Sequence, residues 1–411
     1  MASSENGQKT SGASTTPQAT GELPGRLVTI DSLRGVAALA VVFSHVVGAP
    51  TWVERWPPAD PIVGIAALFP LGFAGVYLFF IISGFCIHFR YARQLESGQA
   101  PRVDFVSFWK RRIKRLYPAY FVALLLYLAV KYASTREFSS WGALDTTLHL
   151  LLLHNIDSRT SHTICGVFWT LAIEEQLYLA YFALLAMRNR FGWKLSLAGS
   201  FIVRLGWMLF FTLFSEGIYK TFHIQLSLPA ASAQYWFIWI LGAISAEAVC
   251  NQVKLPHWCR SMPLAAWLVA TAAVLHLLRF WNLLRTPAID LGVALALDTL
   301  WAVGFWLFFN AVIAYEVTNR RRSKLPRLVT LTAAIGTFSY SLYLTHLLVI
   351  ERFCRALGWS GNVHLELLLI LPAIGFAYVF YLIIEKPCVD APRNNSRELA
   401  AKLTAPGNQA S

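Results

Sequence analysis

The sequence predicts an all-α, polytopic integral membrane protein with about ten transmembrane helices. Of its 411 residues, 56% are hydrophobic and only 14% are charged, whereas soluble globular chains carry about 25% charged residues. Apolar runs of about 20 residues, each long enough to cross a bilayer, recur along the chain and lack the alternation of barrel strands. We expect spans near 28–48, 62–89, 116–134, 166–187, 193–214, 233–251, 261–281, 290–316, 332–351 and 364–385.

Polar segments flank the apolar region at both ends. Residues 1–25 are rich in Ser, Thr, Gly and Gln and contain no apolar core, so we expect a disordered tail and no signal peptide. We expect residues 26–387 to form one transmembrane domain and residues 388–411 to form a second polar tail. The apolar run 144–156 is too short to span a bilayer, and we expect an interfacial or re-entrant segment there.

The formal net charge of +13 indicates membrane topology rather than nucleic-acid binding. When the N-terminus is placed in the cytoplasm, Lys and Arg concentrate in both tails and in the loops on the same side, as the positive-inside rule requires. We therefore expect a multi-pass protein of the cell membrane with both termini in the cytoplasm. The six cysteines are scattered without a CxxC pair, which indicates neither a metal site nor a disulfide framework.

An arginine and a histidine share one face of the first predicted span. The stretch "DSLRGVAALAVVFSH", residues 31–45, holds Arg34 near one end and His45 at the other. Eleven helical steps of about 100° bring His45 to within about 20° of Arg34, roughly 16 Å further along the axis. Because polar groups inside a bilayer are costly and usually functional, both are candidates for a catalytic site. The alternative role for Arg34 is an ion pair with Asp31.

A basic cluster precedes the third predicted span in "FWKRRIKRLYP", residues 108–118. One interpretation is a topology anchor that contacts anionic lipid head groups. The other is a phosphate site, because Arg112 and Arg115 share a helical face and each guanidinium can bind two phosphate oxygens. Arg111 is a further candidate for this site. A nucleotide-bearing cofactor that arrives from the cytosol fits the second interpretation.

Two adjacent carboxylates lie within the fourth predicted span, in "FWTLAIEEQLYLAYF", residues 168–182. Glu174 and Glu175 are roughly 12 Å from the outer end of this span, a depth at which carboxylates are usually functional. The alternative is that one lies at the interface and the other pairs with a buried arginine. Trp169 is a candidate for stacking on a sugar, although tryptophans at the interface or in packing are at least as common in membrane proteins.

A second histidine lies in the ninth predicted span, in "GTFSYSLYLTHLLV", residues 336–349. Tyr343 and His346 fall in its outer half and are candidates for contact with substrate. A lone histidine at such a position is also commonly a packing residue whose ring is satisfied locally. The sequence leaves both interpretations open.

Together these stretches resemble acyltransferase family 3, a family of integral-membrane O-acyltransferases. "IDSLRGVAALAVVFSH" is similar to the family's first-span signature, in which a histidine follows an arginine or lysine after ten intervening residues. Five further stretches follow in the family's order: "GVYLFFIISGFCI", "WKRRIKRLYPAYF", "FWTLAIEEQLYL", "SYSLYLTH" and "IIEKP". The resemblance covers about residues 28–390. Thr345 departs from it, since tryptophan is common there, and this changes the wall beside His346.

The resemblance implies transfer of an acyl group, expected to be acetyl from acetyl-CoA, to a hydroxyl of a surface polysaccharide, exopolysaccharide or lipid-linked glycan. A small natural product such as a macrolide is the alternative acceptor. His45 is the natural base for the hydroxyl proton, and Glu174 or Glu175 could orient it. Alternatively, His45 could accept the acyl group itself. Arg34 would lie along the path of the acyl carrier, whose phosphates would meet Arg112 and Arg115.

A glycolipid or ion transporter is the rival class, because it would also have many spans and intramembrane charges. It would not need a histidine aligned with an arginine, or a phosphate-binding cluster on one side. A non-catalytic receptor or scaffold is disfavoured by the density of intramembrane polar groups. Turnover of acyl-CoA by the purified protein separates the enzyme from both rivals.

Overall fold

The computed structural model describes residues 27–47, 71–135, 140–228, 230–280, 287–319, 325–359 and 362–390. Within these ranges the regular elements are helices, with one isolated β-bridge between Asp157 and Leu226. The helices are α1 (Val28–Val47), α4 (Leu71–Glu96), α5 (Phe105–Thr135), α6 (Ser140–Leu150), α7 (Trp169–Phe222), α8 (Ser232–Val249), α9 (Met262–Phe280), α10 (Pro287–Asn319), α11 (Arg327–Thr337), α12 (Ser339–Leu357), α13 (Val363–Leu368) and α14 (Ile370–Phe380), with a 3₁₀-helix (His257–Arg260) and a π-helix, η2 (Tyr381–Glu385).

The helix lengths confirm an all-α, polytopic membrane protein. Six helices of the described ranges are long and apolar enough to cross a membrane, or seven if α11 and α12 are one bent span. Most of the described part of each predicted run falls on helix, but the runs 166–187 and 193–214 share the single helix α7, which kinks at Gly192. The predicted tails lie outside the described residues, except that residues 388–390 belong to the last helical stretch.

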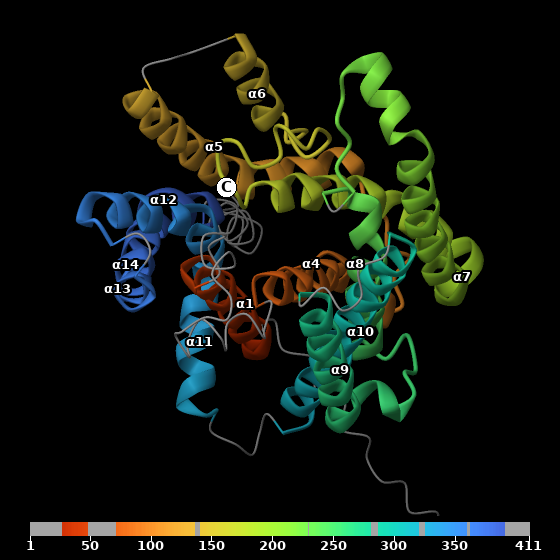
Figure 1. The fold of residues 1–411 in the computed structure, drawn as a ribbon. Coiled ribbons are helices and arrows are strands. Elements are labelled where there is room, and N and C mark those ends of the chain that lie inside the picture. Colours follow the sequence, from red (N-terminus) through yellow and green to blue (C-terminus); the bar gives the residue numbers. More distant parts are fainter. Residues whose placement is uncertain are drawn as a thin grey trace, which may run out of the picture.

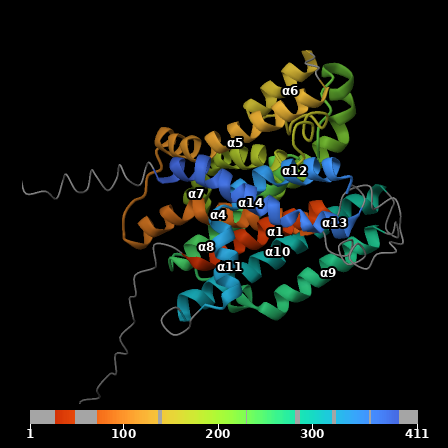
Figure 2. The same ribbon diagram turned by 90° about the vertical axis from the view of Figure 1, so that its left-hand side faces the viewer.

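Two helices occupy the centre of the bundle. Figure 1 shows α1 and α4 surrounded by α5, α8, α10, α11 and α12. Figure 2 shows that most of the long helices run roughly along one common direction. The helix α8 is buried from Gln234 to Ala248 on all its faces, which is expected of a helix that is apolar all round and enclosed by other helices.

Glycines allow α1 to cross α11 at very short range. A Cβ atom on Gly35 would lie 1.9 Å from the carbonyl oxygen of Thr332, and one on Gly336 would lie 1.7 Å from that of Asp31. The hydroxyls of Ser32 and Thr332 are 2.7 Å apart at the same crossing. Small residues of this kind let two helix backbones approach closely in membrane bundles, and here they fix the depth of Arg34, the neighbour of Gly35.

The ninth predicted span is not one continuous helix. It is broken at Phe338 into α11 and α12, which meet at an angle of 76°. Glu385, from the π-helix η2, accepts hydrogen bonds from the backbone N–H of Ser341 at 3.2 Å and from its hydroxyl at 2.5 Å. Because the first N–H groups of a helix have no partner within the helix, this buried carboxylate allows α12 to begin inside the bundle.

Buried carboxylates also tie other helices together. Glu316, near the end of α10, accepts the backbone N–H groups of Val28 and Thr29 at 3.0 and 2.9 Å, and so caps the start of α1. Glu247 of α8 binds His88 of α4 at 3.0 Å and Arg188 of α7 at 2.8 Å. Each carboxylate is bonded to groups from at least one other helix, which is the condition for burying a charge among helices.

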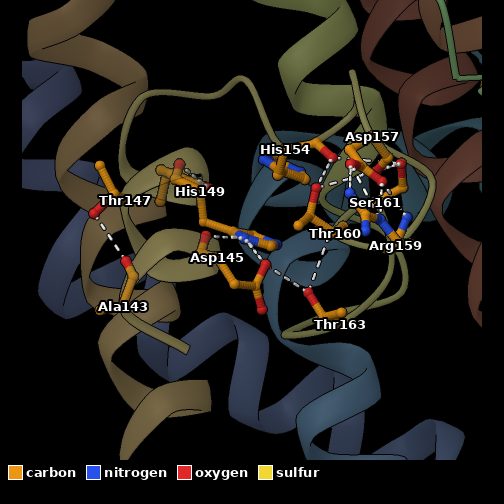
Figure 3. Close-up of polar contacts among 11 residues, drawn as sticks. Ala143, Asp145, Thr147, His149, His154, Asp157, Arg159, Thr160, Ser161 and Thr163 are labelled. Carbon is orange, nitrogen blue, oxygen red and sulfur yellow. Dashed lines mark hydrogen bonds and ion pairs between the residues drawn. The ribbon is translucent and has the colours of Figure 1, made fainter. Parts of the chain in front are cut away.

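The segment between α6 and α7 is held by its own polar contacts (Figure 3). The rings of His149 and His154 stack with centroids 3.9 Å apart. Thr163 donates a hydrogen bond to Asp145 of α6 at 2.8 Å, and Thr160 donates to the carbonyl oxygen of His154 at 2.7 Å. The predicted short run 144–156 therefore contains the end of α6, an 11-residue helix, followed by a structured loop.

The α1–α11 crossing generates a stability prediction. Gly336→Ala should lower the free energy of unfolding by about 1–3 kcal/mol, because the added methyl group overpacks a backbone contact. Gly206→Ala in α7 is the control, since no atom lies within 4 Å of the added Cβ and alanine is otherwise the better helix former. Thermal unfolding of both variants in detergent tests this. Equal midpoints for Gly336→Ala and the wild type would contradict the crossing geometry.

Candidate active site

Three arginines that are far apart in the sequence line one cavity. Arg34 of α1 and Arg112 and Arg115 of α5 surround a space of about 140 Å³, which we call the arginine cavity. Its other walls come from α4, α7 and the start of α12. The three arginines are half-buried, whereas the neighbouring Arg111 and Lys114 are exposed. The structure thus divides the basic cluster into residues that line the cavity and residues that face outward.

Arg112 lacks a full set of hydrogen-bond partners. Its Nε atom is buried and has no hydrogen-bond partner among the described residues. Its guanidinium lies 5.6 Å from the ring centroid of Phe108 and 5.9 Å from that of Tyr178, so aromatic faces hold it in place. A guanidinium that is positioned by rings and retains a donor is suited to bind an anion inside the cavity.

Glu174 also lines the arginine cavity, and two hydroxyls fix its position. Ser83 of α4 donates a hydrogen bond to Glu174 Oε1 at 2.7 Å, and Tyr178, one turn further along α7, donates to the same oxygen. Trp239 of α8 donates to the Ser83 hydroxyl at 3.2 Å. The carboxylate is therefore part of the cavity wall and lies among the arginines.

The two candidate histidines face each other. His45 Nδ1 lies 3.3 Å from His346 Nε2, and the ring centroids are 5.1 Å apart. His346 is fully buried and His45 is half-buried. The side-chain contact of His45 is thus with a histidine, and a role for Glu174 or Glu175 in orienting His45 stays a prediction. The sequence pattern gave no sign of this contact, because the two histidines are 301 residues apart.

The hydrogen bonds define the proton positions on both rings, because a backbone carbonyl can only accept. His346 Nδ1 lies 3.0 Å from the carbonyl oxygen of Leu342 and 2.9 Å from that of Tyr343, so Nδ1 carries the proton and Nε2 presents a lone pair. His45 Nδ1 lies 2.9 Å from the carbonyl oxygen of Val41, so it carries a proton that also points to His346. His45 Nε2 is then unprotonated and able to accept a proton.

Tyr343 connects the arginine cavity with the histidine pair. Its side chain lines the cavity, and its ring centroid lies 6.0 Å from that of His346. Its hydroxyl is 2.6 Å from the hydroxyl of Thr170, and its ring makes an edge contact with Phe79, with centroids 5.8 Å apart. The tyrosine ring therefore forms part of the wall between the charged cavity and the two histidines.

Three predicted site residues lie elsewhere. Glu175 lines a separate cavity of about 20 Å³ between α5 and α7, beside Glu174. Arg111 is exposed and is not among the residues that line the arginine cavity. Trp169 contacts His162 and Tyr235, with ring centroids 6.1 and 6.0 Å away. A role for Trp169 in binding a sugar stays a prediction.

Several residues of the site carry no signal that a sequence pattern could reveal. Ser83, Phe79 and Cys86 line the arginine cavity from α4, in the stretch "GVYLFFIISGFCI" for which sequence reasoning gave no role. Phe79 and Cys86 are apolar or weakly polar residues in an apolar span, and only packing shows which of them face the cavity. Cys86 is the exposed one of the six free cysteines.

One family model covers nearly all of the described helices. The family model described as "Acyltransferase domain" matches residues 27–382, which include both histidines and the three cavity arginines. No solved structure matches the chain.

Among curated proteins, the chain is 27% identical to Nodulation protein 10 of Rhizobium leguminosarum bv. viciae over 385 residues, which cover 87% of this chain and 92% of that protein. It is also 27% identical to O-acetyltransferase OatA of Staphylococcus aureus (strain NCTC 8325 / PS 47) over 168 residues, 39% of this chain and 24% of that protein. Peptidoglycan O-acetyltransferase OatA of Listeria monocytogenes is 28% identical over 166 residues, 38% of this chain and 24% of its own. Because the family model matches most of this chain, the chain belongs to acyltransferase family 3 and is a membrane O-acyltransferase.

Proposed function

We propose that the protein transfers an acetyl group from acetyl-CoA, bound at the cytoplasmic side, to a hydroxyl of a polysaccharide or lipid-linked glycan at the other side of the cell membrane. The observation that supports this most directly is the succession of the arginine cavity, Tyr343 and the His45–His346 pair. Relatives named as O-acetyltransferases, one of them acting on peptidoglycan, support a glycan acceptor.

The arginine cavity fits the donor. Its three guanidiniums suit the phosphates of coenzyme A, and the unsatisfied Arg112 Nε is a donor for a phosphate oxygen. Apolar side chains of α4, among them Phe79 and Phe80, line the rest and suit a narrow acyl-bearing arm. Glu174 places one negative charge in the same wall, so the arginines outnumber it. When bound, acetyl-CoA supplies the activated thioester that the reaction needs.

The histidine pair suits the proton transfer. In this proposal His45 Nε2 takes the proton of the acceptor hydroxyl as its oxygen attacks the acyl carbon. The C–S bond then breaks, and the departing thiolate takes that proton from His45, so the products are the O-acyl ester and the free thiol. His346 Nε2 accepts the His45 Nδ1–H throughout, which keeps His45 in the tautomer that acts as a base.

The donor prediction uses Cys86 as a reporter. In a Cys388→Ser background, coenzyme A should slow the reaction of Cys86 with a maleimide, because both occupy the arginine cavity. Arg112→Lys or Arg115→Lys should raise the half-protecting concentration about tenfold, since the loss of a charge-assisted hydrogen bond costs roughly 1.5–3 kcal/mol. Arg111→Lys is the matched control, because Arg111 faces outward. If all three variants changed the half-protecting concentration equally, Arg112 and Arg115 would have only the role of a topology anchor.

The catalytic prediction concerns the histidine pair. His45→Ala and His45→Gln should both lower kcat by about 10²–10⁴-fold, because neither side chain can act as a positioned base. His346→Leu should lower kcat with little change in KM, whereas His346→Gln should restore part of it, since its carbonyl can accept the His45 Nδ1–H. The exposed His257→Ala is the control. Acetyl transfer by purified variants measures this; a wild-type kcat for His45→Ala would exclude His45 as the base.

The orientation is tested with two engineered cysteines. Ser107 precedes the basic stretch of α5, and Ile156 lies in the loop after α6; both are exposed. A membrane-impermeant maleimide should label Ile156→Cys in intact cells and should label Ser107→Cys only after lysis, because the positive-inside rule places the basic stretch in the cytoplasm. The opposite pattern would reverse the orientation and, with it, the side from which the donor arrives.

A further inference from the structure

The helices α5 and α12 both contribute to the wall of the arginine cavity, and further along they also line a second cavity. It has a volume of about 220 Å³ and lies between Tyr127 and Lys131 of α5 and the C-terminal half of α12. Thr163 and Ile164 close it from the loop that precedes α7. We call it the second cavity.

The two cavities lie in order along α12. Ser339, Tyr340 and Tyr343 line the arginine cavity, and Leu348 and the residues after it line the second cavity. His346 lies between the two sets in the sequence. Since Ser339 shares the arginine cavity with Arg34, and His346 faces His45, α12 runs in the same direction as α1. The second cavity is therefore at the end of the bundle where α1 ends, which the proposed orientation places outside the cytoplasm.

Two hydrogen bonds between α5 and α12 follow the same order as the two cavities. The hydroxyl of Tyr340 donates a hydrogen bond to the carbonyl oxygen of Leu116 at 3.1 Å, beside the arginine cavity. Eight residues further along α12 and eleven further along α5, the backbone N–H of Leu348 donates to the hydroxyl of Tyr127 at 2.9 Å, in the wall of the second cavity. The spacing between the two cavities is thus set by two rigid helices bonded to each other twice.

Among the described residues that line the second cavity, cations outnumber carboxylates. Lys131, Arg352 and Arg355 contribute three cations, and Glu351 contributes one carboxylate, which lies 3.7 Å from Arg355. The positive-inside rule concentrates Lys and Arg in cytoplasmic loops, so it does not account for three cations grouped around a cavity at the opposite end. A site for an anion does account for them.

We propose that the second cavity binds a negatively charged group, a carboxylate or a phosphate, of the acceptor glycan. This inference rests on the proposed function, and it names the acceptor's chemical class as an anionic glycan. The loop wall suits such a role because it is held in place before any ligand binds: Thr163 is bonded to Asp145 of α6 and to the carbonyl oxygen of Thr160 (Figure 3). A preformed wall lowers the entropy lost on binding.

The experiment places a cysteine reporter in the wall. Ile164→Cys, in a background that carries Cys86→Ser and Cys388→Ser, is reconstituted in nanodiscs of phosphatidylcholine and treated with an anionic or a cationic methanethiosulfonate. Two matched pairs of sugars are added as competitors: N-acetylglucosamine 1-phosphate with N-acetylglucosamine, and glucuronate with glucose. The rates are compared with those of Lys131→Gln and Arg355→Gln, which remove one cation each, and of Glu351→Gln, which removes the carboxylate.

The anionic reagent should react several-fold faster than the cationic one, and this ratio should fall in Lys131→Gln and Arg355→Gln and rise in Glu351→Gln. At least one charged sugar should protect the cysteine at a concentration about tenfold below that of its neutral partner. Equal protection within both pairs, or no protection, would overturn the inference. Protection only in nanodiscs that contain phosphatidylglycerol would assign the cavity to a lipid head group. Protection of Cys86 by coenzyme A tests the proposed function separately, so one can fail without the other.

Discussion

A helix that begins inside an apolar bundle needs acceptors for its first backbone N–H groups, and this constraint determines the position of α12. In hydrocarbon, an unpaired backbone group costs several kcal/mol. Glu385 meets the requirement by accepting the N–H and the hydroxyl of Ser341. Glu385 belongs to the π-helix η2, and π-helices are local distortions that are frequent at functional sites. The last helical stretch of the described residues thus fixes where α12 starts and how it is directed.

The rest of the site follows from this start. Once α12 begins beside the arginine cavity, its 3.6-residue period directs Tyr343 into the cavity wall and His346 onto α1. The crossing of α1 over α11 through Gly35 and Gly336 then brings His45 to the same level. The histidine contact therefore depends on two separate packing arrangements, a capped helix start and a close helix crossing.

The sequence predicted those parts of the protein that depend on local patterns. Apolar runs located the helices, and the 3.6-residue period identified Arg34 and His45 as residues on one stripe and Arg112 and Arg115 as a pair. Contacts between distant segments could not be predicted. The break at Phe338 depends on Glu385, which lies 44 residues after Ser341. Tertiary packing brings His346 to His45 and bonds Glu174 to Ser83 and Tyr178, and no local pattern indicates either contact.

The distribution of charge explains why a neutral histidine is a suitable neighbour for His45 at this depth. A carboxylate buried among apolar helices carries a large desolvation penalty unless cations and hydrogen bonds offset it. Glu174 has two hydroxyl donors and lies among three arginines, so its charge is supported in the arginine cavity. His346 lies in a fully buried site whose acceptors are backbone carbonyls, where a neutral imidazole is far less costly. Charged groups thus collect in the arginine cavity, where the proposed anionic donor would bind, and the histidine pair proposed to handle the proton lies where a neutral ring is least costly.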